Sequence, residues 1–211
     1  MSAQPPRRPS LAERRKAETR LDIARTAARL FAEHGTADVT AEQIAAEAGI
    51  GLRTFYRYSR TKEEAVEPLL ATGAQRWLEV VASGPHRLPM LPELEQAIRA
   101  ALTFDGAPED LETTRGLIRA MDDDPALRTI WHRINMESER DLYRVLADLV
   151  GPTADLLQLR LIAAAAAGAI RIAVEQWASG SGPTSGTGSP VDLALHALRI
   201  LAADALPINS E

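Results

Sequence analysis

Three arginines and a tyrosine lie close together near residue 55, in types and spacing that suit contact with nucleic acid. Arg53, Arg57 and Arg60 occur at positions i, i+4 and i+7, and Tyr56 directly precedes Arg57. In a helix this spacing places the three arginines along one face. Guanidinium groups bind phosphate oxygens and pair bidentately with guanine, and a tyrosine hydroxyl can bond to phosphate. Such a face can act on DNA only if a rigid scaffold presents it.

The surrounding residues predict that scaffold as two short helices joined by a tight turn. Thr40 and Gln43 have the spacing of a capping box, which begins a helix over residues 41–48. Gly49 ends this helix, and helical spacing resumes over residues 52–58. The order of helix, tight turn and helix is that of a DNA-binding helix-turn-helix.

Helical patterns also flank this unit. Residues 11–34 have helical apolar spacing, and Gly35 is placed to end that helix. Thr61 and Glu64 form a second capping-box pattern and begin another long helix, in which Pro68 should produce a bend. The helix-turn-helix is therefore predicted to lie between two longer helices.

The remaining sequence predicts further helices. Aromatic residues make up 4% of the chain, and apolar residues recur at helical rather than alternating spacing. Asp124 and Thr153 are expected to be N-caps. The predicted helices cover about residues 92–104, 108–122, 125–149, 153–179 and 191–205. We therefore predict an all-α fold with an N-terminal helix-turn-helix domain and a C-terminal helical domain.

Residues 19–70 resemble the DNA-binding domain of the TetR family. A leading helix precedes the motif, the second helix of the motif reads TFYRY, and a Thr-Lys pair opens the helix that follows. The resemblance implies base contacts from Arg53, Thr54 and Arg57, and phosphate contacts from Thr40, Tyr56, Tyr58 and Lys62. The chain departs from the family at Ser59, where a buried aromatic residue is usual, so weaker packing is expected at that corner.

Charge is distributed unevenly along the 211 residues. Residues 1–62 carry 12 Lys and Arg against 7 Asp and Glu, a net charge of +5, whereas residues 63–211 carry 12 against 22, a net charge of -10. A basic end on an acidic body is expected when only that end meets phosphate. We predict a disordered basic tail over residues 1–10, a DNA-binding domain over residues 11–62, and a ligand-binding and dimerisation domain over residues 63–211.

Several other classes of protein are disfavoured. The chain has no cysteine, which excludes disulfides, thiolate zinc sites and thiol redox sensing. Its four histidines are scattered, and neither a nucleophile elbow nor a phosphate-binding glycine loop is found. The first ten residues contain no apolar stretch typical of a secretory signal, and the apolar segment 161–170 is shorter than a membrane span. We expect no catalytic residues, no metal, no cofactor and no membrane contact, and a cytoplasmic location.

A helical body on a TetR-like head implies a small-molecule inducer that binds between the body helices. The apolar candidates for contact with it are Trp77, Phe104, Met121, Trp131, Met136 and Trp177. The spacing of each of these residues also fits an ordinary core position. Residues 121–146 are similar to regulatory domains of the family that bind acyl-CoA-like ligands, including those of mycofactocin-type regulators. An apolar ligand such as an acyl thioester is the resulting expectation.

Residues 154–178 and 191–205 are expected to form a homodimer. Alanine and glycine dominate from Ala163 to Ala169, so helix backbones can approach closely across a twofold axis, with Ala166 on the shared face. A buried helix within one chain is the alternative reading. A twofold pair of recognition helices favours palindromic, double-stranded operator DNA. The alternatives to a ligand-released repressor are a constitutive DNA-binding or structural protein and, with less support, a helical enzyme.

Overall fold

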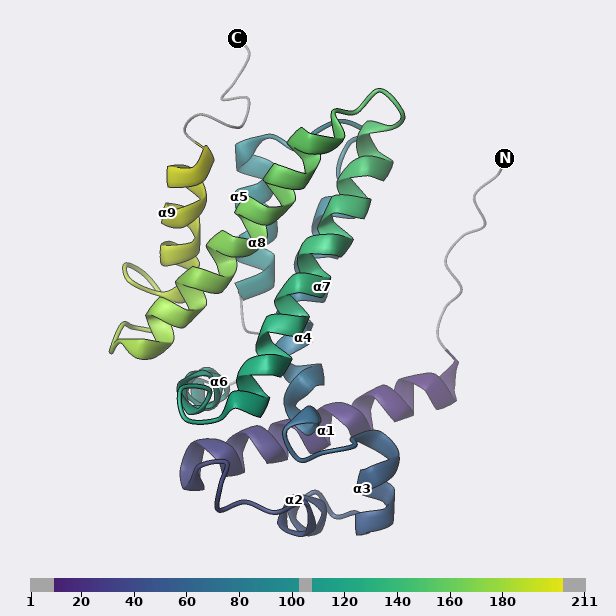
Figure 1. Ribbon diagram of the computed structural model, residues 1–211, viewed down its shortest axis with the longest axis vertical. Helices are drawn as coiled ribbons and strands as arrows, with labels where there is room; N and C mark the ends of the chain where they lie inside the picture. Colours follow the sequence, from purple (N-terminus) through teal and green to yellow (C-terminus); the bar gives the residue numbers. More distant parts are fainter. Residues whose placement is uncertain (1–9, 103–107, 203–211) are drawn as a thin grey trace.

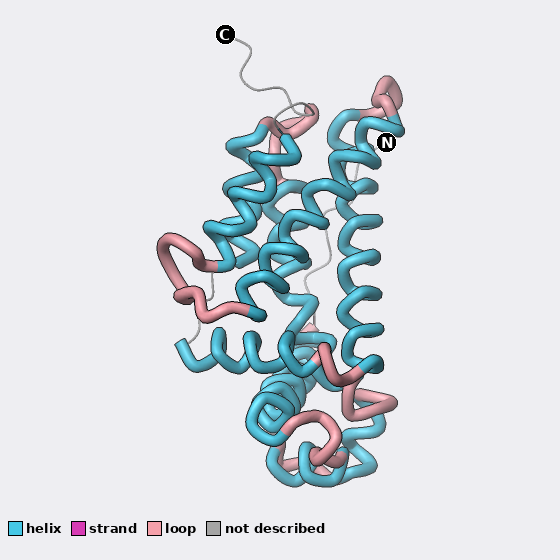
Figure 2. The backbone as a smooth tube through the Cα atoms, turned by 60° about the vertical axis from the view of Figure 1, so that its left-hand side comes forward, coloured by secondary structure: helices cyan, strands magenta, loops and turns pink. Residues whose placement is uncertain are grey.

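The computed structural model of the protein describes residues 10–102 and 108–202. These residues form helices and no strand (Figure 1, Figure 2). In chain order the helices are α1 (Leu11–His34), α2 (Ala41–Glu47), α3 (Leu52–Tyr58), the short 3-10 helix η1 (Glu64–Val66), α4 (Glu67–Ala82), α5 (Leu91–Leu102), α6 (Pro108–Ala120), α7 (Pro125–Val150), α8 (Leu156–Ser179) and α9 (Pro190–Ala202). The predicted all-α fold is confirmed.

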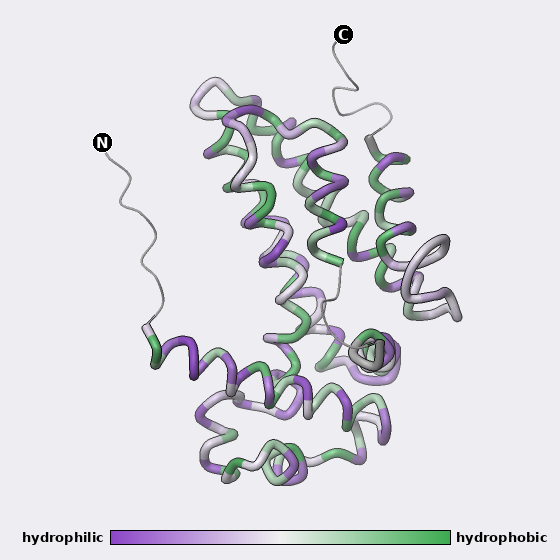
Figure 3. The backbone as a smooth tube through the Cα atoms, turned by 180° about the vertical axis from the view of Figure 1, so that it is seen from behind, coloured by the Kyte–Doolittle hydropathy of each residue, from purple (hydrophilic) through white to green (hydrophobic). Residues whose placement is uncertain are grey.

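The helices α1, α2 and α3 form a head at one end of the molecule (Figure 1). Ser10 caps α1, because its Oγ accepts the Glu13 backbone N–H at 3.2 Å while the Glu13 carboxylate accepts the Ser10 backbone N–H at 2.6 Å. Gly35 ends α1 with a φ of 77°, a left-handed value that glycine adopts without strain. The first buried residue of α1 is Ile23, and the turns before it are mainly hydrophilic (Figure 3).

The head and the base of the body share one apolar core. Phe31 of α1 and Phe55 of α3 are buried in the same cluster as Leu117 of α6, Trp131 of α7 and Trp177 of α8. Helices α2 and α3 have only seven residues each, well below the length at which an isolated helix is stable in water. The helix-turn-helix therefore depends on this shared core for its stability.

A second core holds the upper part of the body together. Its largest buried members are Trp77, Leu94, Ile98, Leu142 and Leu146, which come from α4, α5 and α7. The same core continues along α8 and α9, which pack against each other. By length and composition alone α8 could cross a membrane, but ten of its 24 residues are buried inside the protein. This burial is the arrangement of a core helix.

Two details of the predicted helices are wrong, and one is confirmed. Pro68 does not bend a long helix, because it occupies the first turn of α4. Backbone N–H groups in the first turn have no hydrogen-bond partner within the helix, so the proline removes no helical hydrogen bond there. Helix α8 is capped by Asp155 rather than Thr153, since the Asp155 carboxylate accepts two backbone N–H groups at 2.9 and 3.2 Å. Asp124 caps α7 as predicted.

Helix α6 connects the head to the far end of α8. Gly116 lies so close to α1 that a Cβ atom at this position would be 2.7 Å from the Cβ atom of Ala32. On the side of α8, the Arg119 guanidinium donates to the carbonyl oxygens of Ala178 and Gly180, each at 2.5 Å. The position of α6 is therefore fixed by contacts with both parts of the molecule.

We expect Gly116→Ala to lower the free energy of unfolding by about 1 to 3 kcal/mol, because the added methyl group forces α6 away from α1. Urea denaturation at one protein concentration, followed by circular dichroism, measures the change. Ala32→Gly restores the space at a helix-propensity cost of about 1 kcal/mol. The double variant should be less destabilised than the sum of the two single variants, and strict additivity would contradict the contact.

Candidate nucleic-acid interface

Helix α3 carries the predicted DNA-contacting side chains at the end of the molecule away from the body (Figure 1). Arg53 and Arg57 are exposed, and Tyr56 keeps 51% of its surface exposed. Thr54 and Tyr58 are partly buried. The structure thus brings these five side chains together on one short helix, and three of them face solvent.

The orientation of this face is fixed by one buried ring. Phe55 is fully buried, and its ring meets that of Tyr56 edge to face with centroids 5.5 Å apart. The Arg57 guanidinium lies 5.5 Å from the centroid of the Tyr58 ring, a cation–π contact that limits its rotation. Burial of Phe55 on one side of α3 leaves the polar residues on the other.

Thr40 lies at the start of α2 and forms the predicted capping box. Its Oγ1 accepts the Gln43 backbone N–H at 3.2 Å, and the Gln43 side-chain oxygen accepts the Thr40 backbone N–H at 2.7 Å. Thr40 remains exposed beside the first turn of α2. It is therefore available for the phosphate contact that the sequence predicts.

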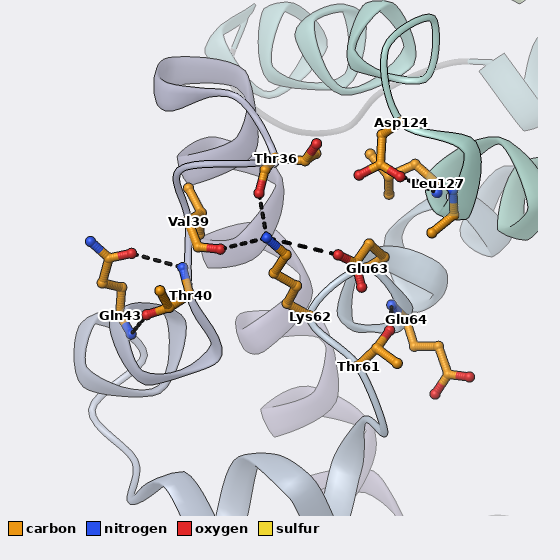
Figure 4. Close-up of polar contacts among 11 residues, drawn as sticks. Thr36, Val39, Thr40, Gln43, Thr61, Lys62, Glu63, Glu64, Asp124 and Leu127 are labelled. Carbon is orange, nitrogen blue, oxygen red and sulfur yellow. Dashed lines mark hydrogen bonds and ion pairs between the residues drawn. The ribbon is translucent and has the colours of Figure 1, made fainter.

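The Lys62 ammonium group is bonded within the protein, whereas the sequence predicts that it contacts a DNA phosphate (Figure 4). Its Nζ donates to the carbonyl oxygens of Thr36 at 2.5 Å and Val39 at 2.8 Å, and lies 3.9 Å from a Glu63 carboxylate oxygen. Two of the three N–H donors of the ammonium group are thus bonded to backbone carbonyls, and the Glu63 carboxylate lies at ion-pair distance. Lys62 thus ties the loop that leads into α2 to the start of η1, and acts as a positioning residue for the helix-turn-helix.

The segment between α3 and α4 forms only half of the second predicted capping box. Thr61 Oγ1 accepts the Glu64 backbone N–H at 3.1 Å, but the Glu64 carboxylate accepts the backbone N–H of Arg60 instead of that of Thr61. The Arg60 side chain also lies 3.6 Å from this carboxylate. Ser59 is buried, with its backbone N–H bonded to Phe55 at 3.0 Å. The corner is closed by backbone bonding, where the family usually has an aromatic side chain.

Arg29 connects α1 to the last residue of α2. Its guanidinium donates to the Glu47 carboxylate across the two helices and to the Glu33 carboxylate at 3.0 Å within α1. The hydrogen bond to Glu47 is the main reason why the pKa of Arg29 is raised above its ordinary value. This ion pair holds the first helix of the motif against α1 at a partly exposed position.

A cavity of about 550 Å³ lies between the head and the body. It is lined by residues from α1, α4, α5, α6, α7, α8 and the start of α9. The volume is within the range of small-molecule sites. Because α1 contributes to the wall, a molecule in this cavity would contact the DNA-binding head directly.

The six predicted ligand contacts separate into four groups. Trp77, Trp131 and Trp177 line this cavity. Met121 lines a smaller neighbouring cavity of about 420 Å³ and is absent from the walls of the first. Met136 lines neither cavity: it is 56% exposed on α7, and its spacing from Trp131 places it outside the core face. Phe104 lies outside the described residues.

Sequence reasoning missed the polar groups in the cavity wall. Arg25 and Arg29 of α1 and Asn135 and Ser138 of α7 all line the cavity. Ser138 Oγ accepts the indole N–H of Trp77 at 3.2 Å, which joins α7 to α4. A signal was present in the sequence, since residues 131, 135 and 138 recur at i, i+4 and i+7 and so share one helix face.

The first residue of α4 is bonded to α7. The Arg133 guanidinium donates to the two carboxylate oxygens of Glu67 at 3.2 and 2.9 Å, and this hydrogen bonding is the main cause of the raised pKa of Arg133. Bidentate pairing fixes orientation as well as distance. The junction between the motif and the body is therefore tied to the helix that carries Trp131.

Among the described residues, no group of His, Asp and Glu could hold a metal ion.

The sequence of the head matches a known family. Residues 23–67 match the model of bacterial regulatory proteins of the tetR family. The chain is 29% identical over 154 residues to the HTH-type transcriptional regulator TcmR of Streptomyces glaucescens. This alignment covers 71% of the chain and 68% of TcmR. The chain is 33% identical over 92 residues to the transcriptional regulator MftR of Mycobacterium tuberculosis. That alignment covers 44% of the chain and 46% of MftR.

The N-terminal domain of the chain is that of the TetR family of bacterial regulators. TetR-family proteins are DNA-binding transcriptional regulators, so the predicted family and the general function are confirmed. The fold agrees as well. A TetR-family regulator from Syntrophomonas wolfei has a TM-score of 0.62 at 16% identity, covering 91% of this chain and 98% of that one. The FadR repressor of Thermus thermophilus, solved with lauroyl-CoA, has a TM-score of 0.52 at 18% identity, covering 91% and 97%.

We expect Arg57→Ala and Lys62→Met to weaken DNA binding in different ways. Arg57→Ala should lower affinity for a DNA site selected from random oligonucleotides by about 1 to 3 kcal/mol and relax one base preference. It should leave the melting temperature unchanged, because Arg57 is exposed. Lys62→Met should lower the free energy of unfolding by about 1.5 to 3 kcal/mol, because it removes hydrogen bonds from a charged donor.

Fluorescence anisotropy across a salt titration separates the two effects. The salt dependence of binding should stay unchanged in Lys62→Met, since no phosphate contact is lost. A flatter salt dependence with normal stability in Lys62→Met would instead restore the phosphate role that the sequence predicts.

Proposed function

We propose that this TetR-family protein is a ligand-responsive repressor of the cytoplasm. As a homodimer it binds a palindromic operator, and a small, largely apolar molecule releases it. Residues 11–62 bind the DNA, and residues 63–211 bind the ligand and the partner subunit. The observation that carries the proposal is the cavity whose walls come from both α1 and the body helices. A bound molecule there would touch the head and the body at once.

The proposed DNA contacts follow the exposed face of α3. Base edges are contacted by Arg53, Thr54 and Arg57, and phosphates by Thr40, Tyr56 and Tyr58. The exposure of both arginines and the fixed position of Phe55 beneath them support this assignment. Lys62 is left out of the set, because its ammonium group already has three partners.

The proposed dimer face is an exposed apolar stripe on α8. Leu157, Leu161 and Ile172 are more than half exposed and, with Gly168, recur at spacings that share one side of the helix. Ile200 of α9 is also 63% exposed. An exposed apolar stripe of this kind is typical of a surface that another protein covers. Ala166 is not part of it, because it is buried within its own subunit, so the expected shared position was wrong.

We expect Leu161→Arg to convert the dimer to a monomer at micromolar concentration, because it places a charge in an apolar interface. Gln96→Arg, at an exposed position of α5, is the matched control and should leave the dimer intact. Light scattering coupled to gel filtration measures the mass. DNA selected by the dimer should be an inverted repeat with half-sites about 34 to 36 Å apart. A monomeric parent protein, or a site without twofold symmetry, would refute the dimer.

The cavity favours a ligand that is mainly apolar. Trp77, Ile134, Ile170 and Val174 contribute apolar wall. Asn135 contributes a side-chain carbonyl that no described contact uses, since its amide nitrogen alone is bonded, to Trp131. A few polar groups in an apolar wall are the usual makeup of a small-molecule site, in which they fix orientation. The acyl thioester in the FadR complex is one molecule of this kind.

All three tryptophans of the chain line the cavity, so intrinsic fluorescence reports on its occupancy. Acyl-CoAs and polycyclic aromatic compounds should include a binder that changes this fluorescence and lowers operator affinity. A tenfold loss of affinity corresponds to about 1.4 kcal/mol of coupling, and DNA must weaken ligand binding equally. Ala167→Phe should reduce ligand binding and retain operator binding. If every cavity binder left operator affinity unchanged, a constitutive DNA-binding protein would be the better description.

A further inference from the structure

We propose that the ligand of this cavity carries an acidic group, and that this group binds Arg29 in exchange for Glu47. The inference rests on the proposed function, since it assigns the chemistry of the same cavity. It adds a route by which the ligand acts on the helix-turn-helix: the residue that receives the acid is the residue that ties α1 to α2.

The charge of the cavity wall supports an anion. Its charged residues are Arg25, Arg29 and Arg76, and no Asp or Glu of the described residues lines it. Arg25 and Arg29 belong to the basic head, and a guanidinium pairs well with a carboxylate, sulfonate or phosphate.

Two of the three arginines in the wall, Arg25 and Arg29, come from α1. Arg25 and Arg29 are one turn apart on α1 and so share a face. Within the part of the chain that the structure describes, the partner of Arg25 is Asp22, at 3.6 Å. Trp77 and Trp177, which also line the cavity, are almost fully buried. A ligand with an apolar body and one acidic end would place that end beside α1.

Arg29 is the point at which occupancy of the cavity can reach the motif. Its Nη2 donates to Glu47, the last residue of α2, directly before the turn into α3. Its Nη1 donates to Glu33 within α1. Because Glu47 is partly exposed, water can solvate its carboxylate when an incoming anion takes its place. Helix α2 would then lose a tie to α1 without leaving a buried charge unpaired.

Two dyes of matched shape test the charge requirement. 1-Anilinonaphthalene-8-sulfonate is an anion, and N-phenyl-1-naphthylamine has the same rings without the sulfonate. Both are titrated against the full-length protein, and quenching of the three tryptophans shows that they enter the cavity. The ratio of the two dissociation constants is compared between variants, so that the different solubilities of the dyes cancel.

Arg29→Gln should lower the preference for the anionic dye roughly two- to fivefold, the range expected for a partly exposed ion pair. Arg20→Gln is the matched control, because it removes an exposed arginine of the same helix that does not line the cavity. Arg29→Lys should keep part of the preference. An unchanged ratio in Arg29→Gln would overturn the proposal and leave the cavity as a site for neutral ligands.

The exchange with Glu47 is tested on operator binding. Glu47→Gln should weaken operator binding in the absence of dye roughly two- to fivefold and reduce the further effect of the anionic dye. Glu33→Gln removes the other partner of Arg29 but keeps the tie between the helices, so it should leave operator affinity unchanged. Equal effects of the two variants would overturn the exchange. If neither dye quenched the tryptophans, both the cavity's role in the proposed function and this inference would fail.

Discussion

The structure depends on one packing constraint, the burial of the head against the base of the body. Helices α2 and α3 are too short to be stable alone, and Phe55 is buried in a core to which α1, α6 and α7 also contribute. A rigid recognition surface and a link to the body therefore have a single physical origin. Any displacement of the core at Trp131 or Trp177 must be accommodated by the helices that carry the DNA-facing side chains.

The same residues serve as core and as cavity wall. Ile118, Trp131 and Trp177 belong to the shared core and also line the cavity. A space of about 550 Å³ inside a packed protein forfeits dispersion contacts that a ligand would supply. A ligand that fits one arrangement of these walls better than another would shift the protein toward that arrangement. In a close-packed interior such adjustments occur as discrete repacking, which suits a regulator that needs two states.

The sequence predicted features that depend on local chemistry. The Thr40 capping box, the end of α1 at Gly35 and the order of helices each follow from a few neighbouring residues, and the structure has all of them. Features that depend on tertiary geometry were not predictable in this way. Lys62 bonds to carbonyl groups more than twenty residues away, and Met136 turns outward although its residue type suits a core. The Arg29 to Glu47 pair joins two helices whose relative position no local pattern encodes.

Behind the cavity, the wall formed by Trp177 is held rigid. The buried Arg115 guanidinium lies 4.2 Å from the Trp177 ring centroid, donates to Glu112 at 2.9 Å and bonds the backbone carbonyl of Gly182. The Trp177 indole N–H donates to Pro183 at 3.0 Å, so the ring is fixed at its face and at its edge. The Trp177 side of the cavity is thus held by several contacts of a buried ring, whereas the α1 side is held by partly exposed ion pairs that water can replace. The wall held by exposed ion pairs is the one attached to the head, so under the proposed function a ligand would act more readily on the head than on the Trp177 side.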